Sequence, residues 1–130
     1  MPPRVMMVDD NDSDLLYTRV TLQRCGEPCE VMAFERAQDA LAHLRGTPGH
    51  GVRLILLDIN MPVMDGFAFL DAFEALPPAQ RGQAVVAMLS SSSDPADRTR
   101  ALAYASVADY LTKPLERTLA ANLLRRTTQG

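Results

Sequence analysis

The sequence predicts an α/β domain with a doubly wound parallel sheet, in which helices cover both faces of the sheet. Two observations predict this class. Three apolar runs are continuous, as in strands buried on both faces of a parallel sheet, and each ends at a polar residue; these runs are residues 5–8, 54–57 and 84–89. Segments with helical spacing separate the runs, and alternating strands and helices predict a parallel sheet with right-handed crossovers.

Five strands and five helices are expected in alternating order. The first helix follows Asp9 and Asp10, where Asn11 offers an N-cap and acidic side chains suit a helix N-terminus, and it closes at Gly26. The remaining elements are strands at 30–34 and 108–111, helices at 37–44 and 67–76, one from 94 to about 105, and a last helix marked by leucines at 115, 119, 123 and 124.

Proline marks two of the helix boundaries. Pro77 and Pro78 should stop the third helix, and Asp94 followed by Pro95 predicts an N-cap with proline at the first helical position of the fourth. We expect the strand order 2-1-3-4-5, which makes the first and third strands neighbours at the point where the order reverses. Ligands of such sheets bind outside the carboxyl ends of the strands, so the function is expected there.

Length and composition limit the classes of protein to which this chain can belong. The chain has 130 residues and a formal net charge of -3, from 13 Lys and Arg against 16 Asp and Glu, which fits a single domain over residues 1–130. The mild acidity argues against a nucleic-acid surface, which needs a basic face. The longest apolar run has only 6 residues, at 84–89, far short of the ~20 that cross a bilayer. We therefore expect a cytoplasmic protein without membrane insertion, whose two cysteines are reduced thiols.

Polar residues follow four of the five expected strands. Because parallel strands end at one edge of the sheet, these residues should share a site. Three carboxylates that meet there repel one another unless a cation intervenes, and oxygen ligands without His or Cys favour Mg²⁺. A lysine and a hydroxyl beside them suit a phosphoryl group, which an aspartate can accept as an acyl phosphate. The residues are Asp9, Asp10, Asp58, Ser90, Ser91 and Lys113.

At these residues the sequence resembles the receiver domain of bacterial two-component response regulators, over nearly its whole length. The motifs that carry the resemblance are VDDN at residues 8–11, LDINMPVMDG at 57–66, SS at 90–91 and YLTKP at 110–114. The resemblance implies a flavodoxin-like receiver fold. It also implies a signalling function, in which a sensor histidine kinase or a histidine phosphotransfer protein donates a phosphoryl group to the domain.

The resemblance assigns a role to each site residue. Asp58 would be the phospho-acceptor, and Mg²⁺ would be held by Asp9, Asp10, Asp58 and the main-chain carbonyl of Asn60. Lys113 and Ser90 would contact the phosphoryl group, while the small Ser91 would leave the acceptor open to a phosphodonor. Ser90 and Tyr110 would form a switch that alters the face made by the fourth helix, the fifth strand and the fifth helix. That face would bind a downstream protein or form a homodimer, or the phosphoryl group would pass onward.

The same family pattern gives Lys113-Pro114 a cis peptide bond and places Asn60 and Ser92 where the lifetime of the acyl phosphate is tuned.

Simpler interpretations compete at single positions. Asp9 and Asp10 would serve equally well as helix-capping acids, Ser92 as a plain loop residue and Tyr110 as a packed strand aromatic. Both histidines, at positions 43 and 50, are expected at the surface.

Two other functions compete with phospho-acceptance. A binding module that works without phosphorylation is the main alternative. A phosphatase of the aspartyl-phosphate type is disfavoured, because Asn60 stands where such enzymes need an acidic residue. The domain is therefore not expected to be an enzyme, beyond catalysing its own phosphorylation and dephosphorylation. Only residues 125–130 follow the last expected helix, which predicts a receiver that stands alone without an output domain.

Overall fold

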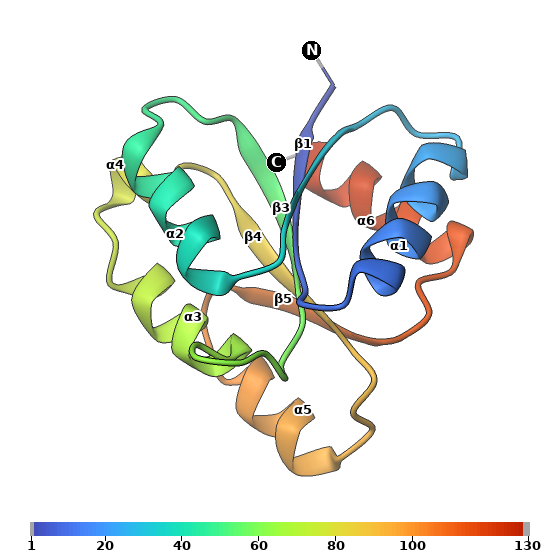
Figure 1. The fold of residues 1–130 in the computed structure, drawn as a ribbon. Coiled ribbons are helices and arrows are strands. Elements are labelled where there is room, and N and C mark those ends of the chain that lie inside the picture. Colours follow the sequence, from blue (N-terminus) through green and yellow to red (C-terminus); the bar gives the residue numbers. More distant parts are fainter. Residues whose placement is uncertain (1, 129–130) are drawn as a thin grey trace.

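The structure is a computed structural model that describes residues 2–128 of the chain. Its centre is a parallel sheet of five strands in the order β2-β1-β3-β4-β5, as predicted. Helices cover both faces of this sheet (Figure 1). The strands are β1 (Arg4–Val8), β2 (Glu30–Phe34), β3 (Val52–Leu57), β4 (Val85–Ser90) and β5 (Val107–Thr112).

Within residues 2–128, six helices connect the strands or follow them, one more than expected. The additional helix is the single turn α4, which begins at Pro78 directly after the proline that the sequence marks as a stop. Proline at the first helical position costs no hydrogen bond, because that N–H has no partner within the helix, so Pro78 opens a new turn. The helices are α1 (Asp12–Arg24), α2 (Ala37–Gly46), α3 (Gly66–Glu74), α4 (Pro78–Arg81), α5 (Pro95–Leu102) and α6 (Arg117–Thr128).

The core has two parts, one on each side of the sheet. On one side α1 and α6 pack their leucines against the strands. On the other side α2 and α3 bury their leucines and α5 buries Ala101, and this side holds the large aromatic side chains Phe69 and Phe73. Each central strand is buried on both faces because each face is covered, which explains the continuous apolar runs. None of the described helices is both long enough and apolar enough to span a bilayer.

Both predicted N-caps are confirmed. The Asn11 side chain accepts a hydrogen bond from the Asp14 N–H at 3.0 Å, and Asp94 accepts one from the Ala96 N–H at 2.9 Å. Each cap satisfies an N–H group that lacks a partner within its helix. The cap at Asn11 places the first turn of α1 directly after Asp9 and Asp10, at the carboxyl end of β1.

His50 is buried, so the prediction of a surface residue is wrong. Only 3% of this residue is exposed. Its Nδ1 accepts a hydrogen bond from the Val52 N–H at 3.0 Å, and its Nε2 lies 2.7 Å from the carbonyl oxygen of Gln80. Glycines with positive φ on either side, Gly49 and Gly51, turn the loop so that the ring points inward. His50 is thus a structural residue whose two ring nitrogens are both hydrogen-bonded.

Candidate functional site

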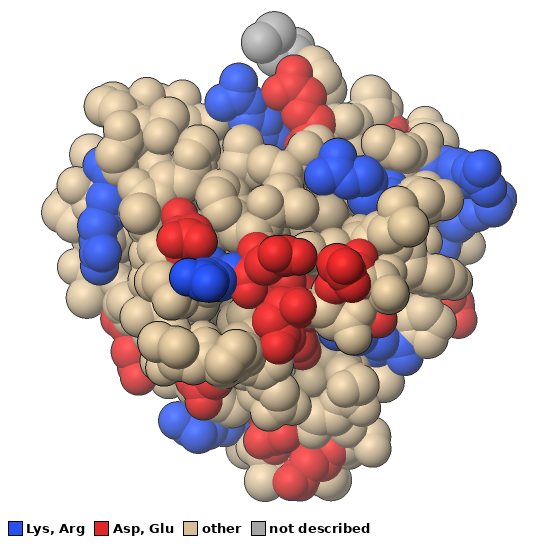
Figure 2. All heavy atoms as spheres, viewed as in Figure 1, with Lys and Arg blue, Asp and Glu red and all other residues tan. Residues whose placement is uncertain are grey.

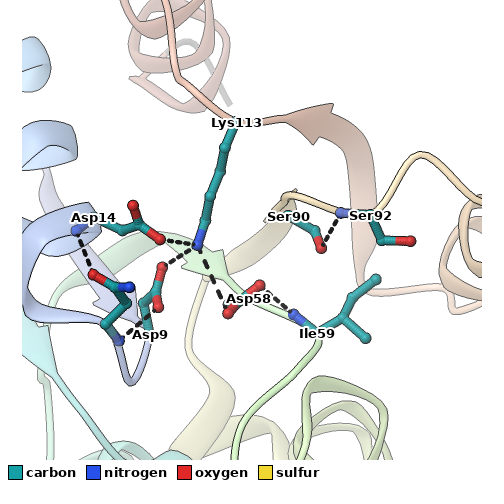
Figure 3. A network of polar contacts seen from close by, with 8 residues as sticks. Asp9, Asp14, Asp58, Ile59, Ser90, Ser92 and Lys113 are labelled. Atoms are coloured by element: carbon teal, nitrogen blue, oxygen red, sulfur yellow. Dashed lines mark hydrogen bonds and ion pairs between the residues drawn. The ribbon is translucent and has the colours of Figure 1, made fainter.

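The sheet itself positions the site, because the hydrogen-bond ladder continues one residue beyond the strands. Three polar residues use their backbone N–H to bond to the neighbouring strand at its carboxyl end. Their side chains therefore start from a rigid edge and point into one region (Figure 3). The bonds run from Asp9 to the Phe34 carbonyl at 3.0 Å, from Asp58 to the Val8 carbonyl at 3.0 Å and from Lys113 to the Ser90 carbonyl at 2.8 Å.

An acidic cluster lies at this edge, as the sequence predicts. Asp9, Asp10 and Asp58 each offer a carboxylate oxygen, and these oxygens all lie within 4.8 Å of one another. Asp9 and Asp58 are buried, with 7% of each residue exposed, whereas Asp10 is open to solvent. Figure 2 shows acidic side chains gathered over the place where β1 ends beside the first turn of α1. Clustered carboxylate oxygens with one open side suit a hard divalent cation that keeps some of its waters.

Lys113 brings a positive charge into the cluster from the other side. Its Nζ lies 2.6 Å from Asp9 Oδ2 and 3.7 Å from Asp58 Oδ2. It also lies 2.8 Å from Asp14 Oδ2, in the first turn of α1. The side chain reaches between these three carboxylates (Figure 3). The sequence marks Asp14 only as an acid in the first turn of a helix, and its contact with Lys113 depends on how α1 packs beside the sheet.

The electrostatics of Asp58 differ from those of an ordinary aspartate. Burial and the nearby Asp9 carboxylate raise the pKa of Asp58 to about 6, and the Lys113 ammonium only partly opposes this rise. Burial by itself would lower the pKa of Lys113, but the hydrogen bonds to Asp14 and Asp9 and the negative charges of Asp58 and Asp9 together outweigh burial, so that pKa is raised. Near neutral pH the site therefore holds a charged lysine and an aspartate that is mostly ionised.

The two oxygens of Asp58 have different surroundings. Oδ1 accepts a hydrogen bond from the Ile59 N–H at 2.9 Å, while Oδ2 faces Lys113. The following loop approaches Asp58 closely, because the Gly66 N–H donates to the Ile59 carbonyl at 2.7 Å. Asn60 is exposed in this loop, two residues after Asp58. Asp58 is thus held by its own loop, and one of its oxygens is turned toward Lys113.

Ser90 and Tyr110 are connected through the loop after β4. Ser90 is fully buried, and its Oγ accepts a hydrogen bond from the Ser92 N–H at 3.1 Å. The Ser92 carbonyl in turn accepts one from the Tyr110 hydroxyl at 3.0 Å. Ser92 Oγ also donates to Asp97 Oδ2 at 2.7 Å, so Ser92 is more than a plain loop residue. Ser91, between them, is exposed.

Tyr110 points into the protein, with 5% of the residue exposed. The Arg98 guanidinium, from α5, donates to the Tyr110 carbonyl at 3.3 Å and lies 5.9 Å from the centre of its ring. The expected face of fourth helix, fifth strand and fifth helix corresponds to α5, β5 and α6 here, because α4 is additional. The expected cis peptide bond at Lys113-Pro114 is present.

Comparison with known proteins agrees with this geometry. The chain is 35% identical over 127 residues to the sensor protein GacS of Pseudomonas syringae pv. syringae, with 96% of this chain and 13% of GacS covered. It is 38% identical over 112 residues to the transcriptional regulatory protein PrrA of Mycobacterium tuberculosis, with 86% of this chain and 44% of PrrA covered. The chain thus spans less than half the length of these relatives, and the expectation that it lacks an output domain stays a prediction.

Solved structures show the same fold. A two-component response regulator from Cytophaga hutchinsonii superposes with a TM-score of 0.90 at 26% identity, covering 99% of this chain and 98% of the other. The chemotaxis protein CheY4 of Vibrio cholerae superposes with a TM-score of 0.78 at 28% identity, covering 98% and 99%. The family described as the response regulator receiver domain matches residues 5–125. This match shows that the chain belongs to the receiver domain family of two-component systems.

Proposed function

We propose that this chain accepts a phosphoryl group on Asp58 from the phosphohistidine of a sensor histidine kinase or a histidine phosphotransfer protein. One observation carries the proposal: a buried aspartate shares the carboxyl edge of the sheet with two further carboxylates and a lysine 3.7 Å away. Receiver domains of this kind interact with histidine kinases or partner proteins.

The reaction is a transfer between two nucleophiles. A carboxylate oxygen of Asp58 attacks phosphorus and forms an O–P bond, while the P–N bond to the donor imidazole breaks and the nitrogen keeps the electron pair. The attacking carboxylate must be ionised, which a pKa of about 6 allows at neutral pH. Because the exposed Ser91 is small, it leaves the acceptor accessible to a donor.

The donor set fits Mg²⁺, which receiver domains generally use. Asp9, Asp10, Asp58 and the main-chain carbonyl of Asn60 would hold the ion, which when bound neutralises charge on the phosphoryl oxygens and on the carboxylates. Lys113 supplies an ammonium beside the same oxygens. Ser90 Oγ already accepts a hydrogen bond, so its O–H is the donor that it offers to a phosphoryl oxygen.

Phosphorylation would change the surface formed by α5, β5 and α6. The link from Ser90 through Ser92 to Tyr110 supports this, because a shift of Ser90 toward the phosphoryl group pulls on the loop whose carbonyl holds the tyrosine hydroxyl. The altered face would bind a downstream protein or a second copy of the chain, or the phosphoryl group would pass onward. In this proposal the domain is not an enzyme, beyond catalysing its own phosphorylation and dephosphorylation.

The test is the intact mass of the protein after incubation with Mg²⁺ and either acetyl phosphate or phosphoramidate. We expect one phosphoryl group on the wild type and none on Asp58→Asn or in the presence of EDTA. Phosphorylation of Asp58→Asn would refute the acceptor assignment. If neither donor nor a panel of purified histidine kinases phosphorylates the wild type, the domain is instead a binding module that works without phosphorylation.

A further inference from the structure

Lys113 is shared between carboxylates in a way that the family motifs do not explain. Its Nζ is closer to Asp14 Oδ2, at 2.8 Å, than to Asp58 Oδ2, at 3.7 Å. Asp14 belongs to α1 and lies 99 positions away in the sequence. The lysine that should contact a phosphoryl group on Asp58 is therefore hydrogen-bonded to the first turn of α1 (Figure 3).

We propose that Asp14 is a positioning residue that competes with phosphorylated Asp58 for Lys113. The inference rests on the proposed function, since it needs a phosphoryl group on Asp58. In the unphosphorylated protein the ammonium lies 2.6 Å from Asp9 and 2.8 Å from Asp14, and phosphorylation draws it away from Asp14 to the phosphoryl oxygens. Asp14 thereby lowers the affinity of the site for a phosphoryl group and sets a threshold for activation.

The charge on Asp58 explains why the Lys113 ammonium would move from Asp14 to a phosphorylated Asp58. A carboxylate carries one negative charge, whereas an acyl phosphate carries close to two at neutral pH and offers three oxygens as acceptors. Lys113 has three N–H donors on a flexible stem, so its ammonium follows the strongest local negative charge. The lysine therefore has more to gain at a phosphorylated Asp58 than at the carboxylate.

Asp14 is also the partner that Lys113 leaves most easily. The Asp14 side chain is 41% exposed, against 10% for Asp9 and 8% for Asp58. Water can therefore solvate the Asp14 carboxylate once the lysine has left, and the N-terminus of α1 favours a negative charge in its first turn. Leaving Asp9 or Asp58 would strand a buried carboxylate, which costs more.

The competing interpretation is that Asp14 merely holds Lys113 ready for the phosphoryl group. The two interpretations predict opposite changes in the affinity for a phosphoryl mimic when Asp14 is removed. If Asp14 competes, its removal strengthens the binding of a phosphoryl mimic, and if Asp14 assists, its removal weakens it. Only the first result supports the proposal.

The experiment measures the dissociation constant of beryllofluoride, a mimic of the phosphoryl group, by ¹⁹F NMR titration at saturating Mg²⁺. We expect Asp14→Asn to bind about fivefold more tightly than the wild type, since a partly exposed ion pair contributes on the order of 1 kcal/mol. Asp14→Glu should stay within about twofold of the wild type. Asp12→Asn is the matched control, because it removes one exposed charge from the same turn.

The same substitution made in a Lys113→Met variant tests whether Asp14 acts on beryllofluoride affinity through Lys113. In Lys113→Met the substitution Asp14→Asn should change beryllofluoride affinity by less than about twofold, because there is no ammonium to compete for. An equal or weaker affinity of Asp14→Asn would overturn the proposal, as would an equal gain in Asp12→Asn or in the Lys113→Met background. Wild type that binds no beryllofluoride would refute both this inference and the proposed function, whereas normal wild-type binding with no gain in Asp14→Asn refutes the inference alone.

Discussion

A Cβ atom placed on Gly66 would lie 2.5 Å from the carbonyl oxygen of Asp58 and 2.9 Å from the Cα of Ile59. The first residue of α3 thus packs directly on the backbone of the proposed acceptor. Any side chain at position 66 must push α3 and the acceptor apart. The glycine at the end of the LDINMPVMDG motif therefore has a steric function that follows from this contact.

Gly66→Ala should lower the free energy of unfolding by about 2 to 3 kcal/mol, because the overlap is with backbone atoms that cannot rotate away. Urea denaturation measures the change. Gly46→Ala is the matched control, since a Cβ there meets nothing within 4 Å, and it should leave stability unchanged or slightly higher. A Gly66→Ala variant as stable as Gly46→Ala would contradict the close approach.

Val63 adopts a backbone conformation that is unfavourable for its side chain. Its φ is +70°, and 95% of the residue is exposed, so no packing compensates for the strain. Val63→Asn should raise the free energy of unfolding by about 1 kcal/mol, because asparagine tolerates the left-handed region. Val63→Ile, which keeps the β-branch, should show no gain. Equal stability of the two variants in urea denaturation would show that position 63 is not strained.

The raised pKa of Asp58 predicts a pH-dependent stability. The pKa is about 6 in the folded protein against an ordinary value of 3.8, so between these values the folded state binds more protons than the unfolded state. The free energy of unfolding therefore falls as pH rises through this window. The full loss of stability from ionising the buried Asp58 is reached above about pH 6.

The Asp58→Asn variant has no carboxylate to ionise at this position, so it does not lose stability in this way. With EDTA present, its stability advantage over the wild type should be small near pH 4 and grow to on the order of 2 kcal/mol at pH 7. Urea denaturation at a series of pH values measures it. Asp12→Asn, an exposed acid, should show a difference that hardly changes over the same range. An advantage of Asp58→Asn that does not depend on pH would refute the assigned pKa.

The acidic cluster predicts which aspartates bind Mg²⁺. Asp10→Asn removes one of the three clustered carboxylates and should weaken Mg²⁺ binding about tenfold or more. Asp12→Asn, two residues later and outside the cluster, should weaken it by less than about threefold through its charge alone. Isothermal titration calorimetry with MgCl₂ measures both without any phosphodonor. Similar losses in the two variants would mean that the ion responds to the overall negative potential and not to a built site.

Local signals in the sequence were sufficient for the framework of this protein. Continuous apolar runs identify strands buried on both faces, and the caps at Asn11 and Asp94 mark helix starts, because each signal acts over a few neighbouring residues. The carboxyl ends of parallel strands share one edge, so the strand order alone placed Asp9, Asp10, Asp58 and Lys113 together.

Tertiary structure decided the contacts that depend on how a helix is rotated or how a loop turns. The pairing of Lys113 with Asp14 joins residues 99 positions apart, and it exists only because α1 packs on the sheet with that carboxylate toward the site. The burial of His50 depends on a loop with two positive-φ glycines, and the role of Ser92 depends on where β5 places Tyr110. A sequence specifies such partners through the packing of the whole domain, so they became visible only once the helices and loops were placed in space.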